Sequence, residues 1–277
     1  MRSRLFPTIN PRLLFSTVVL MIIFTLALFA PWMAPSDPNE MDIALQLKPP
    51  SLHDGMMGWL GYDLNGSSLL TLMIYGARTS LFVALTTVFF SLTVGVLLGL
   101  IAGFCGGRWD MILMRIVDIF MAFPGILLAM ALAAVMGPSL GNVILAISAT
   151  GWTSSARLIR AQTLSIRERE YVTAAFSLGA SSWRILFKHV FPGTLSPLVV
   201  HATFSLSGVI IIEASLSFLG LGAQDGFPSW GALLGQGRTV LQEAPFLSMI
   251  PGMAMAALVM SLNFVGDAMR DAWDPKK

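Results

Sequence analysis

The stretch LFVALTTVFFSLTVGVLLGLIAGF, residues 81–104, decides the fold class, because it carries no charged side chain over a length that can cross a lipid bilayer. A helix needs roughly 20 apolar residues to span the hydrocarbon core. The hydrophobic residues are continuous and do not alternate with polar ones, which favours a helix over a barrel strand. The stretch therefore predicts a membrane-spanning helix.

The rest of the chain repeats this pattern. Of its 277 residues, 55% are hydrophobic and 12% are charged, whereas soluble domains carry about 25% charged residues. Five further apolar runs lie near residues 13–32, 116–136, 143–158, 195–221 and 246–265. The run at 143–158 is short and rich in Ser and Thr. We expect an all-α, polytopic integral membrane protein with about six transmembrane helices.

The first apolar run has two interpretations, a cleaved signal peptide or a retained helix. Its apolar core, residues 13–30, is longer than the roughly 7 to 15 residues of a signal peptide's apolar region, and no small-x-small cleavage site precedes a soluble domain. We expect a retained transmembrane helix.

Lys and Arg set the orientation, because cytoplasmic loops of membrane proteins are enriched in them. With six spans and both termini in the cytoplasm, all 17 of these residues fall inside except Lys48, Arg78 and Arg238. We expect a multi-pass membrane protein with both termini cytoplasmic. Residues 1–78 then form a tail, the first helix and an irregular extracytoplasmic loop, and residues 79–277 form a five-helix core.

Two features of the spans concern packing and bending. Small residues recur every four positions at Ser91, Gly95, Gly99, Gly103 and Gly107, which puts them on one helix face. This face favours packing inside the bundle, with a homodimer seam as the alternative. Pro124 and Gly125 predict a kink in the run 116–136, a candidate gating element.

Several kinds of chemistry find no support. His53, His189 and His201 are not at metal-ligand spacing, no Gly-x-Ser-x-Gly occurs, and no lysine follows a glycine as a phosphate-binding loop requires. We therefore expect no catalysis, no metal and no cofactor. If the protein works against a gradient, the energy must come from another subunit or from an ion. Glu213 is the only carboxylate near mid-span, either a proton or cation site or a structural group.

The loop at about 160–192 is basic and amphipathic. Tyr171, Ala174, Ala175 and Leu178 form one apolar stripe, and Gly179 is expected to end that helix. Ser181 or Ser182 then caps a second helix, and Pro192 ends it before the next span. Its expected stripe is formed by Trp183, Leu186, Phe187 and Val190. These stripes bury either against the protein's own bundle or against a soluble partner.

The same loop resembles the cytoplasmic EAA loop of binding-protein-dependent ABC transporter permeases, whose pattern is Glu-Ala-Ala, three residues, Gly, nine residues, Ile-x-Leu-Pro. Ala174, Ala175 and Gly179 match, Thr173 replaces Glu, His189 stands at the Ile position, and Phe191 and Pro192 stand at Leu-Pro. Residues 217–238 and 263–275 resemble further signatures of the C-type permeases of dipeptide, oligopeptide and nickel importers. Residues 59–68 resemble their entry segment, with Ser67 and Ser68 in place of the usual Arg-Asp.

The resemblance implies a type I ABC importer permease fold and a non-catalytic subunit. Its implied partners are a second homologous permease, two cytoplasmic ATPase subunits that bind the ATP, and an extracytoplasmic substrate-binding protein. Di- or oligopeptides are the expected substrates; the alternatives are nickel or another small solute, or an ion-coupled secondary transporter. The residues expected to form the ATPase-coupling loop are Glu170, Tyr171, Thr173, Ala174, Ala175, Gly179, Ala180, Ser181, Arg184, His189 and Pro192.

Overall fold

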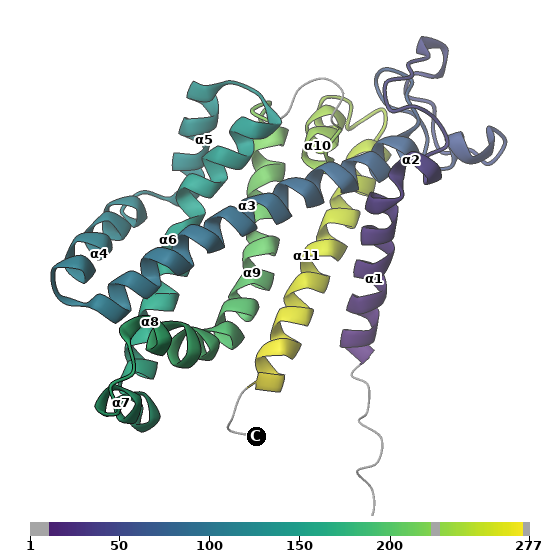
Figure 1. The fold of residues 1–277 in the computed structure, drawn as a ribbon. Coiled ribbons are helices and arrows are strands. Elements are labelled where there is room, and N and C mark those ends of the chain that lie inside the picture. Colours follow the sequence, from purple (N-terminus) through teal and green to yellow (C-terminus); the bar gives the residue numbers. More distant parts are fainter. Residues whose placement is uncertain (1–10, 223–227, 274–277) are drawn as a thin grey trace, which may run out of the picture. The chain divides into compact units, whose positions relative to one another are not determined.

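The computed structural model describes residues 11–222 and 228–273. Its helices, drawn in Figure 1, are α1 (Pro11–Leu28), α2 (Ala30–Met33), α3 (Leu69–Cys105), α4 (Gly107–Met121), α5 (Gly125–Met136), α6 (Leu140–Arg167), α7 (Glu170–Ser177), α8 (Ser182–Ile185), α9 (Phe191–Phe218), α10 (Trp230–Thr239) and α11 (Phe246–Trp273). Short 3₁₀ turns occupy Ile43–Leu45 and Gly55–Gly58, and a π turn occupies Leu186–Val190. The described part contains no β-strand, which confirms the all-α fold class.

Four helical segments are long and apolar enough to cross a membrane: Pro11–Leu28, Leu69–Cys105, Ser182–Phe218 and Phe246–Trp273. The pair α4 and α5 passes the same test together but is bent by 80°. Helix α6 covers the run expected as the fourth span and has 28 residues, about 42 Å of helix, but it is more polar than the others. By length and apolarity, the described residues therefore contain four of the six expected spans, or five if the bent pair is one span. Helix α6 lies where the fourth expected span was placed.

Two expected boundaries are wrong. Helix α3 begins at Leu69, well before residue 81, because the less hydrophobic segment that leads into the apolar run is helical too. Pro192 does not end a helix, since the chain stays helical from Ser182 to Phe218. The π turn just before Pro192, closed by the bond from the Phe191 N–H to the Leu186 carbonyl, widens the helix where the proline ring must fit.

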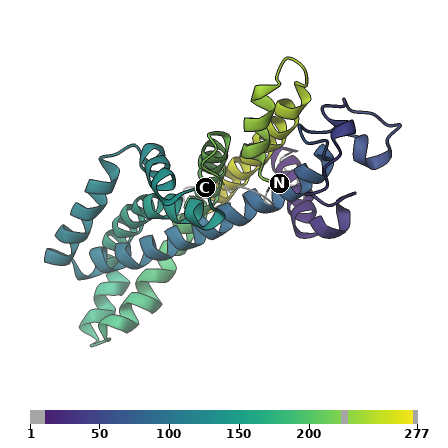
Figure 2. The ribbon, with the colours of Figure 1, turned by 90° about the horizontal axis from the view of Figure 1, so that it is seen from above.

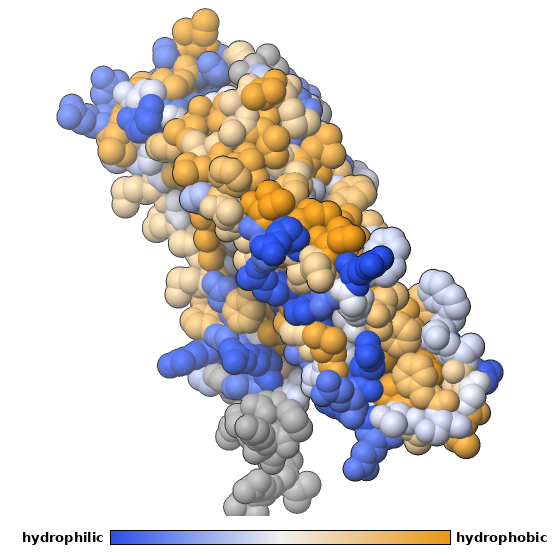
Figure 3. Space-filling model, turned by 90° about the vertical axis from the view of Figure 1, so that its left-hand side faces the viewer, coloured by the Kyte–Doolittle hydropathy of each residue, from blue (hydrophilic) through white to orange (hydrophobic). Residues whose placement is uncertain are grey.

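The chain forms two compact units, residues 1–82 with 213–277 and residues 83–212, and α3 and α9 each run from one into the other. In the first unit α1 and α10 both pack against α11. Helices α10 and α11 lie side by side in both ribbon views (Figure 1 and Figure 2). On the face drawn in Figure 3 the surface is broadly hydrophobic, with hydrophilic residues gathered in patches, as suits a chain whose flanks meet lipid.

The loop of the first unit between α2 and α3, residues 34–68, is held by its own polar groups. The Asp63 carboxylate accepts hydrogen bonds from the backbone N–H groups of Asn65 (2.9 Å) and Ser67 (2.8 Å), and burial raises the pKa of this carboxyl. Ser67 and Ser68, which stand where the resembling family has Arg-Asp, are buried and donate to the carbonyls of Glu40 and Met57. The serines therefore close the loop on itself.

The second unit contains the seam predicted from the small residues. A Cβ added at Gly95, Gly99 or Gly103 would stand 2.7, 2.6 or 2.9 Å from a backbone carbonyl oxygen of α6. Helix α3 therefore packs against α6 backbone to backbone, and these glycines serve the interior of the bundle as favoured. Gly107 does not join the seam, because it is the first residue of α4, with φ +55°, and a Cβ added there would have no atom within 4 Å.

We predict opposite outcomes for two glycine-to-alanine changes in this unit. Gly99→Ala forces the added methyl against the Ala156 carbonyl and should destabilise the protein by about 1–3 kcal/mol, lowering the midpoint of thermal aggregation in detergent. Gly208→Ala places its methyl in open space and should leave the midpoint unchanged or raise it, since alanine favours helices by roughly 1 kcal/mol over glycine. Equal behaviour of the two variants would contradict the seam.

Candidate functional site

The segment between α6 and α9, called here the α7–α8 loop (residues 168–190), folds as the predicted helix-turn-helix. Gly179 has φ +81°, a conformation in which glycine is unstrained. The Gly179 N–H donates to the Phe176 carbonyl and the Ala180 N–H to the Ala175 carbonyl, which satisfies the last carbonyls of α7. Ser181 stands at the start of α8, but its hydroxyl makes no capping bond.

A small buried cluster attaches this loop to the end of α6. Ile166, Val172, Ile185 and Val190 are at most 1% exposed, and Phe104, Ala175, Ala180 and Leu186 pack around them. Sequence reasoning missed Val172 and Ile185, because it took each short helix alone and placed the apolar stripe one position away. A β-branched residue inside each short helix was the available signal.

The residues expected to be buried in the two stripes mostly point away from this cluster. Leu178 is 87% exposed, Trp183 72% and Phe187 55%, and Tyr171 and Ala174 are exposed too. The Trp183 and Phe187 rings stack, with centroids 5.6 Å apart and planes 7° from parallel. We call these five residues the outer face. An apolar surface held outward in this way is typical of an interaction site.

The other expected coupling residues surround the outer face or support it. Glu170, Thr173, Gly179, Ser181, Arg184 and Pro192 are exposed, whereas Ala175, Ala180 and His189 are half-buried. The Tyr171 hydroxyl donates to the His189 carbonyl at 3.4 Å, which joins the two ends of the loop. In the part of the chain that the structure describes, Glu170 and Arg184 form no ion pair and remain available to a partner.

Ion pairs connect the helix that carries the loop to its neighbours. Arg160 on α6 holds the Asp110 carboxylate of α4 with two N–H groups, one of them at 2.6 Å. Arg157, about one turn before Arg160 on α6, forms a second ion pair with Asp118 of α4 at 2.7 Å. Both members of the second pair are half-exposed, so it contributes little in water. Arg167, at the end of α6, donates to the Phe104 carbonyl of α3 at 2.9 Å.

Pro124 and Gly125 lie at the 80° bend between α4 and α5, which confirms the predicted kink. Pro124 is the last residue before α5, and its carbonyl accepts hydrogen bonds from the Leu127 and Leu128 N–H groups.

Among residues 11–222 and 228–273, we find no group of three or more His, Cys, Asp or Glu side chains that could hold a metal ion.

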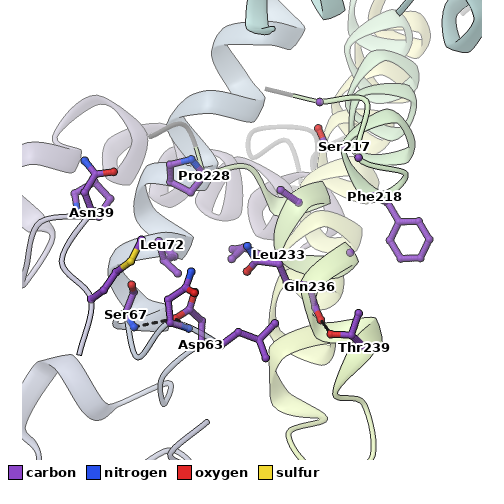
Figure 4. A pocket seen from close by; sticks show the side chains of 18 residues that line it. Asn39, Asp63, Ser67, Leu72, Ser217, Phe218, Pro228, Leu233, Gln236 and Thr239 are labelled. Atoms are coloured by element: carbon purple, nitrogen blue, oxygen red, sulfur yellow. Dashed lines mark hydrogen bonds between the residues drawn. The ribbon is translucent and has the colours of Figure 1, made fainter. Parts of the chain in front are cut away.

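Glu213, the other intramembrane candidate, is 2% exposed and belongs to the first unit. Its carboxylate accepts hydrogen bonds from the hydroxyls of Ser80 (3.1 Å) and Ser217 (2.8 Å). Close by, a cavity of about 630 Å³ is lined by the loop between α2 and α3, the end of α9 and one side of α10 (Figure 4). Sequence reasoning did not foresee α10, although Ser229 before it and Arg238 in its last turn are the usual end signals.

Comparisons with known proteins agree with this architecture. The family model described as "binding-protein-dependent transport system inner membrane component" matches residues 95–277. A second, the N-terminal transmembrane domain of oligopeptide transport permease C, matches residues 10–50.

Curated relatives match over most of the chain. A di/tripeptide transport system permease of Pseudomonas aeruginosa is 42% identical over 93% of this chain and 86% of its own length. A dipeptide transport system permease of Alkalihalophilus pseudofirmus is 40% identical over 94% and 84%. A glutathione transport system permease of Pectobacterium atrosepticum is 40% identical over 92% and 84%.

Solved structures share the fold. The inward-facing MetNI methionine ABC transporter aligns with a TM-score of 0.59 at 20% identity, covering 73% of this chain and 95% of that one. The family match and the relatives settle what the fold leaves open: the chain belongs to the binding-protein-dependent transport system inner membrane components, the permease subunits of ABC importers.

Proposed function

We propose that this chain is one of two permeases in an importer of di- and oligopeptides, driven by two cytoplasmic ATPase subunits and supplied by an extracytoplasmic binding protein. The outer face carries the proposal, since five exposed residues, aromatic or aliphatic for the most part, stand on a loop whose own core is already filled. Such a surface gains free energy by entering a partner's groove, at about 25 cal/mol for each Å² of apolar surface buried.

The partner that fits this surface is an ATPase subunit. The loop's flanking side chains Arg167, Arg169, Arg184 and Lys188 favour the cytoplasmic side, and no phosphate-binding lysine follows a glycine in this chain. ATP is therefore bound by the partner, and the chain itself acts without catalysis or cofactor. Among the coupling residues proposed from the sequence, Glu170 and Arg184 make polar contacts with the ATPase subunit around its groove.

The substrate class follows from the relatives, which are named as di/tripeptide, dipeptide and glutathione permeases. Peptides are thus favoured over nickel. The placement is the bacterial inner membrane with both termini cytoplasmic. Residues 1–78 are proposed as an addition to a core of residues 79–277, in line with the separate family matches at residues 10–50 and 95–277.

The outer face should be needed for ATPase binding and dispensable for folding. Leu178→Asp puts a charge on the most exposed apolar side chain of the loop and should sharply reduce copurification of the ATPase subunits, while the amount of permease in the membrane stays at the wild-type level. Leu52→Asp is the matched control, because Leu52 is 82% exposed on the extracytoplasmic loop; its complex should stay intact. Full ATPase recovery with Leu178→Asp would count against the docking role.

The turn at Gly179 should matter through its backbone. Gly179→Val places a β-branched residue at φ +81°, at a cost of about 1–3 kcal/mol, and should tilt α8 and uncouple ATP hydrolysis from substrate. Gly179→Asn is the control, since asparagine tolerates this conformation. We expect substrate-stimulated ATPase activity to fall strongly in the first variant and to persist in the second. Equal activity would show that the turn geometry is unimportant.

The energy source separates the proposal from an ion-coupled transporter. In cells that retain ATP, uptake of a labelled dipeptide should continue after the proton gradient is collapsed, and it should stop when ATP is depleted. Deletion of this chain should also abolish uptake. Uptake that persists without ATP, or that stops with the gradient alone, would contradict an ATP-driven importer.

A further inference from the structure

The exposed side of helix α6 is small and polar along much of its length. From residue 154 to residue 165 the exposed positions follow at spacings of three and four, and we call them the α6 stripe: Ser154, Arg157, Ala161 and Ser165. Within α6, which is described throughout, Leu145 is the only large hydrophobic side chain that is exposed. Lipid tails require an apolar surface, so the stripe is suited to water or to protein.

Taken as the fourth span, α6 places Arg157 at the depth of the lipid tails. The helix has 28 residues and a length of about 42 Å, which exceeds a hydrocarbon core of roughly 30 Å by about 12 Å. Arg157 lies about 15 Å before the end of the helix. It therefore stays inside the core even if the whole excess lies at that end. A charged side chain at this depth faces a water-filled cavity or a protein group.

Helix α4, in the same compact unit, packs against α6 and supplies the counter-charge. Arg157 donates to the Asp118 carboxylate at 2.7 Å, and the two side chains are 50% and 53% exposed. The pair of Arg160 and Asp110 is less exposed and joined by two hydrogen bonds, so it serves to hold the helices together. An exposed pair contributes at most about 1 kcal/mol. The Arg157–Asp118 pair can therefore open and bind other charged groups.

The exposed apolar face of α4 lies on another side of that helix. It is formed by Trp109, Ile112, Ile116 and Ile119, all exposed. With 3.6 residues per turn, Ile116 lies about 160° around the helix from Asp118. Helix α4 thus separates a face that suits lipid tails from the side where Asp118 meets the α6 stripe.

We propose that the α6 stripe lines a water-filled passage, in which the Arg157–Asp118 pair is a binding subsite for the two charged ends of a peptide. The inference rests on the proposed peptide transport. A peptide carries a carboxylate and an ammonium group, and both lose hydration inside a narrow passage. The Arg157 guanidinium donates to the carboxylate, and the Asp118 carboxylate accepts from the ammonium. When the peptide leaves, the pair closes again.

Water access is tested with single cysteines. Cys105 is the only cysteine of the chain, so Cys105→Ser with Ser154→Cys places one thiol on the stripe, about one turn from Arg157. Ile116→Cys in the same background is the matched control on the apolar face of α4. In inside-out vesicles that hold the whole transporter, a charged maleimide should label the Ser154→Cys variant roughly tenfold or more faster, because a thiol among lipid tails forms little thiolate. Equal rates would overturn the passage.

The subsite is tested by protection of the same thiol. Alanyl-alanine should slow the labelling of the Ser154→Cys variant, whereas the uncharged N-acetyl-alanyl-alanine amide should not. Arg157→Gln should abolish this protection, and Arg157→Lys should keep part of it, because the positive charge remains. Arg108→Gln is the control, since Arg108 is an exposed arginine at the start of α4, and it should leave protection intact. Equal protection by both compounds, or protection that survives Arg157→Gln, would overturn the subsite.

Asp118→Asn keeps the test decisive if Arg157→Gln does not accumulate in the membrane, because it removes the partner of the ammonium group and should also abolish protection. Labelling needs no transport, so the two claims fail separately. If dipeptide uptake is present and alanyl-alanine does not protect, the transport function stands and the subsite does not. If alanyl-alanine protects and dipeptide uptake is absent, the subsite stands and the proposed peptide transport is wrong.

Discussion

The burial of Val172, Ile185 and Val190 against Ile166 is the contact on which the proposed coupling role of the α7–α8 loop depends. Short helices such as α7 and α8 are unstable in water by themselves, so this cluster gives the loop a shape. It also decides which side chains are left outside. Because the cluster is filled, Leu178 and the stacked rings of Trp183 and Phe187 cannot be covered by the loop itself. In the proposed coupling, this surface is the part of the permease that receives work from an ATPase subunit.

Helix α6 gives this surface a rigid connection to the membrane part of the second unit. It leads directly into the loop and packs closely along α3 at Gly95, Gly99 and Gly103, where an added Cβ would collide with α6. Arg160 also ties it to Asp110 on α4. Close-packed helices transmit displacement because they cannot deform into empty space. A push on the loop should therefore move α6 with α3 and α4, and the bend at Pro124 lies where α4 passes into α5.

Much of this could be predicted from the sequence, for physical reasons. Uninterrupted apolar runs, glycines four residues apart, Pro124 and Gly179 each have one dominant structural consequence, and the structure has the corresponding helices, seam, bend and turn. The misses concern tertiary contacts. Which face of α7 is buried depends on Ile166 of the preceding helix α6. Helix α10 is held by Trp230 and Gly231, which meet Met73 of α3 and Ala214 of α9. The roles of individual coupling residues remain predictions.

One measurement tests the central claim most directly, that the outer face lies in the cytoplasm under an ATPase subunit. Cys105→Ser with Leu178→Cys places a single thiol at the most exposed point of the loop. An impermeant maleimide should fail to label it in intact cells, label it in inside-out vesicles stripped of the ATPase, and label it slowly once the ATPase is restored. Labelling in intact cells, or labelling that is indifferent to the ATPase, would contradict the account.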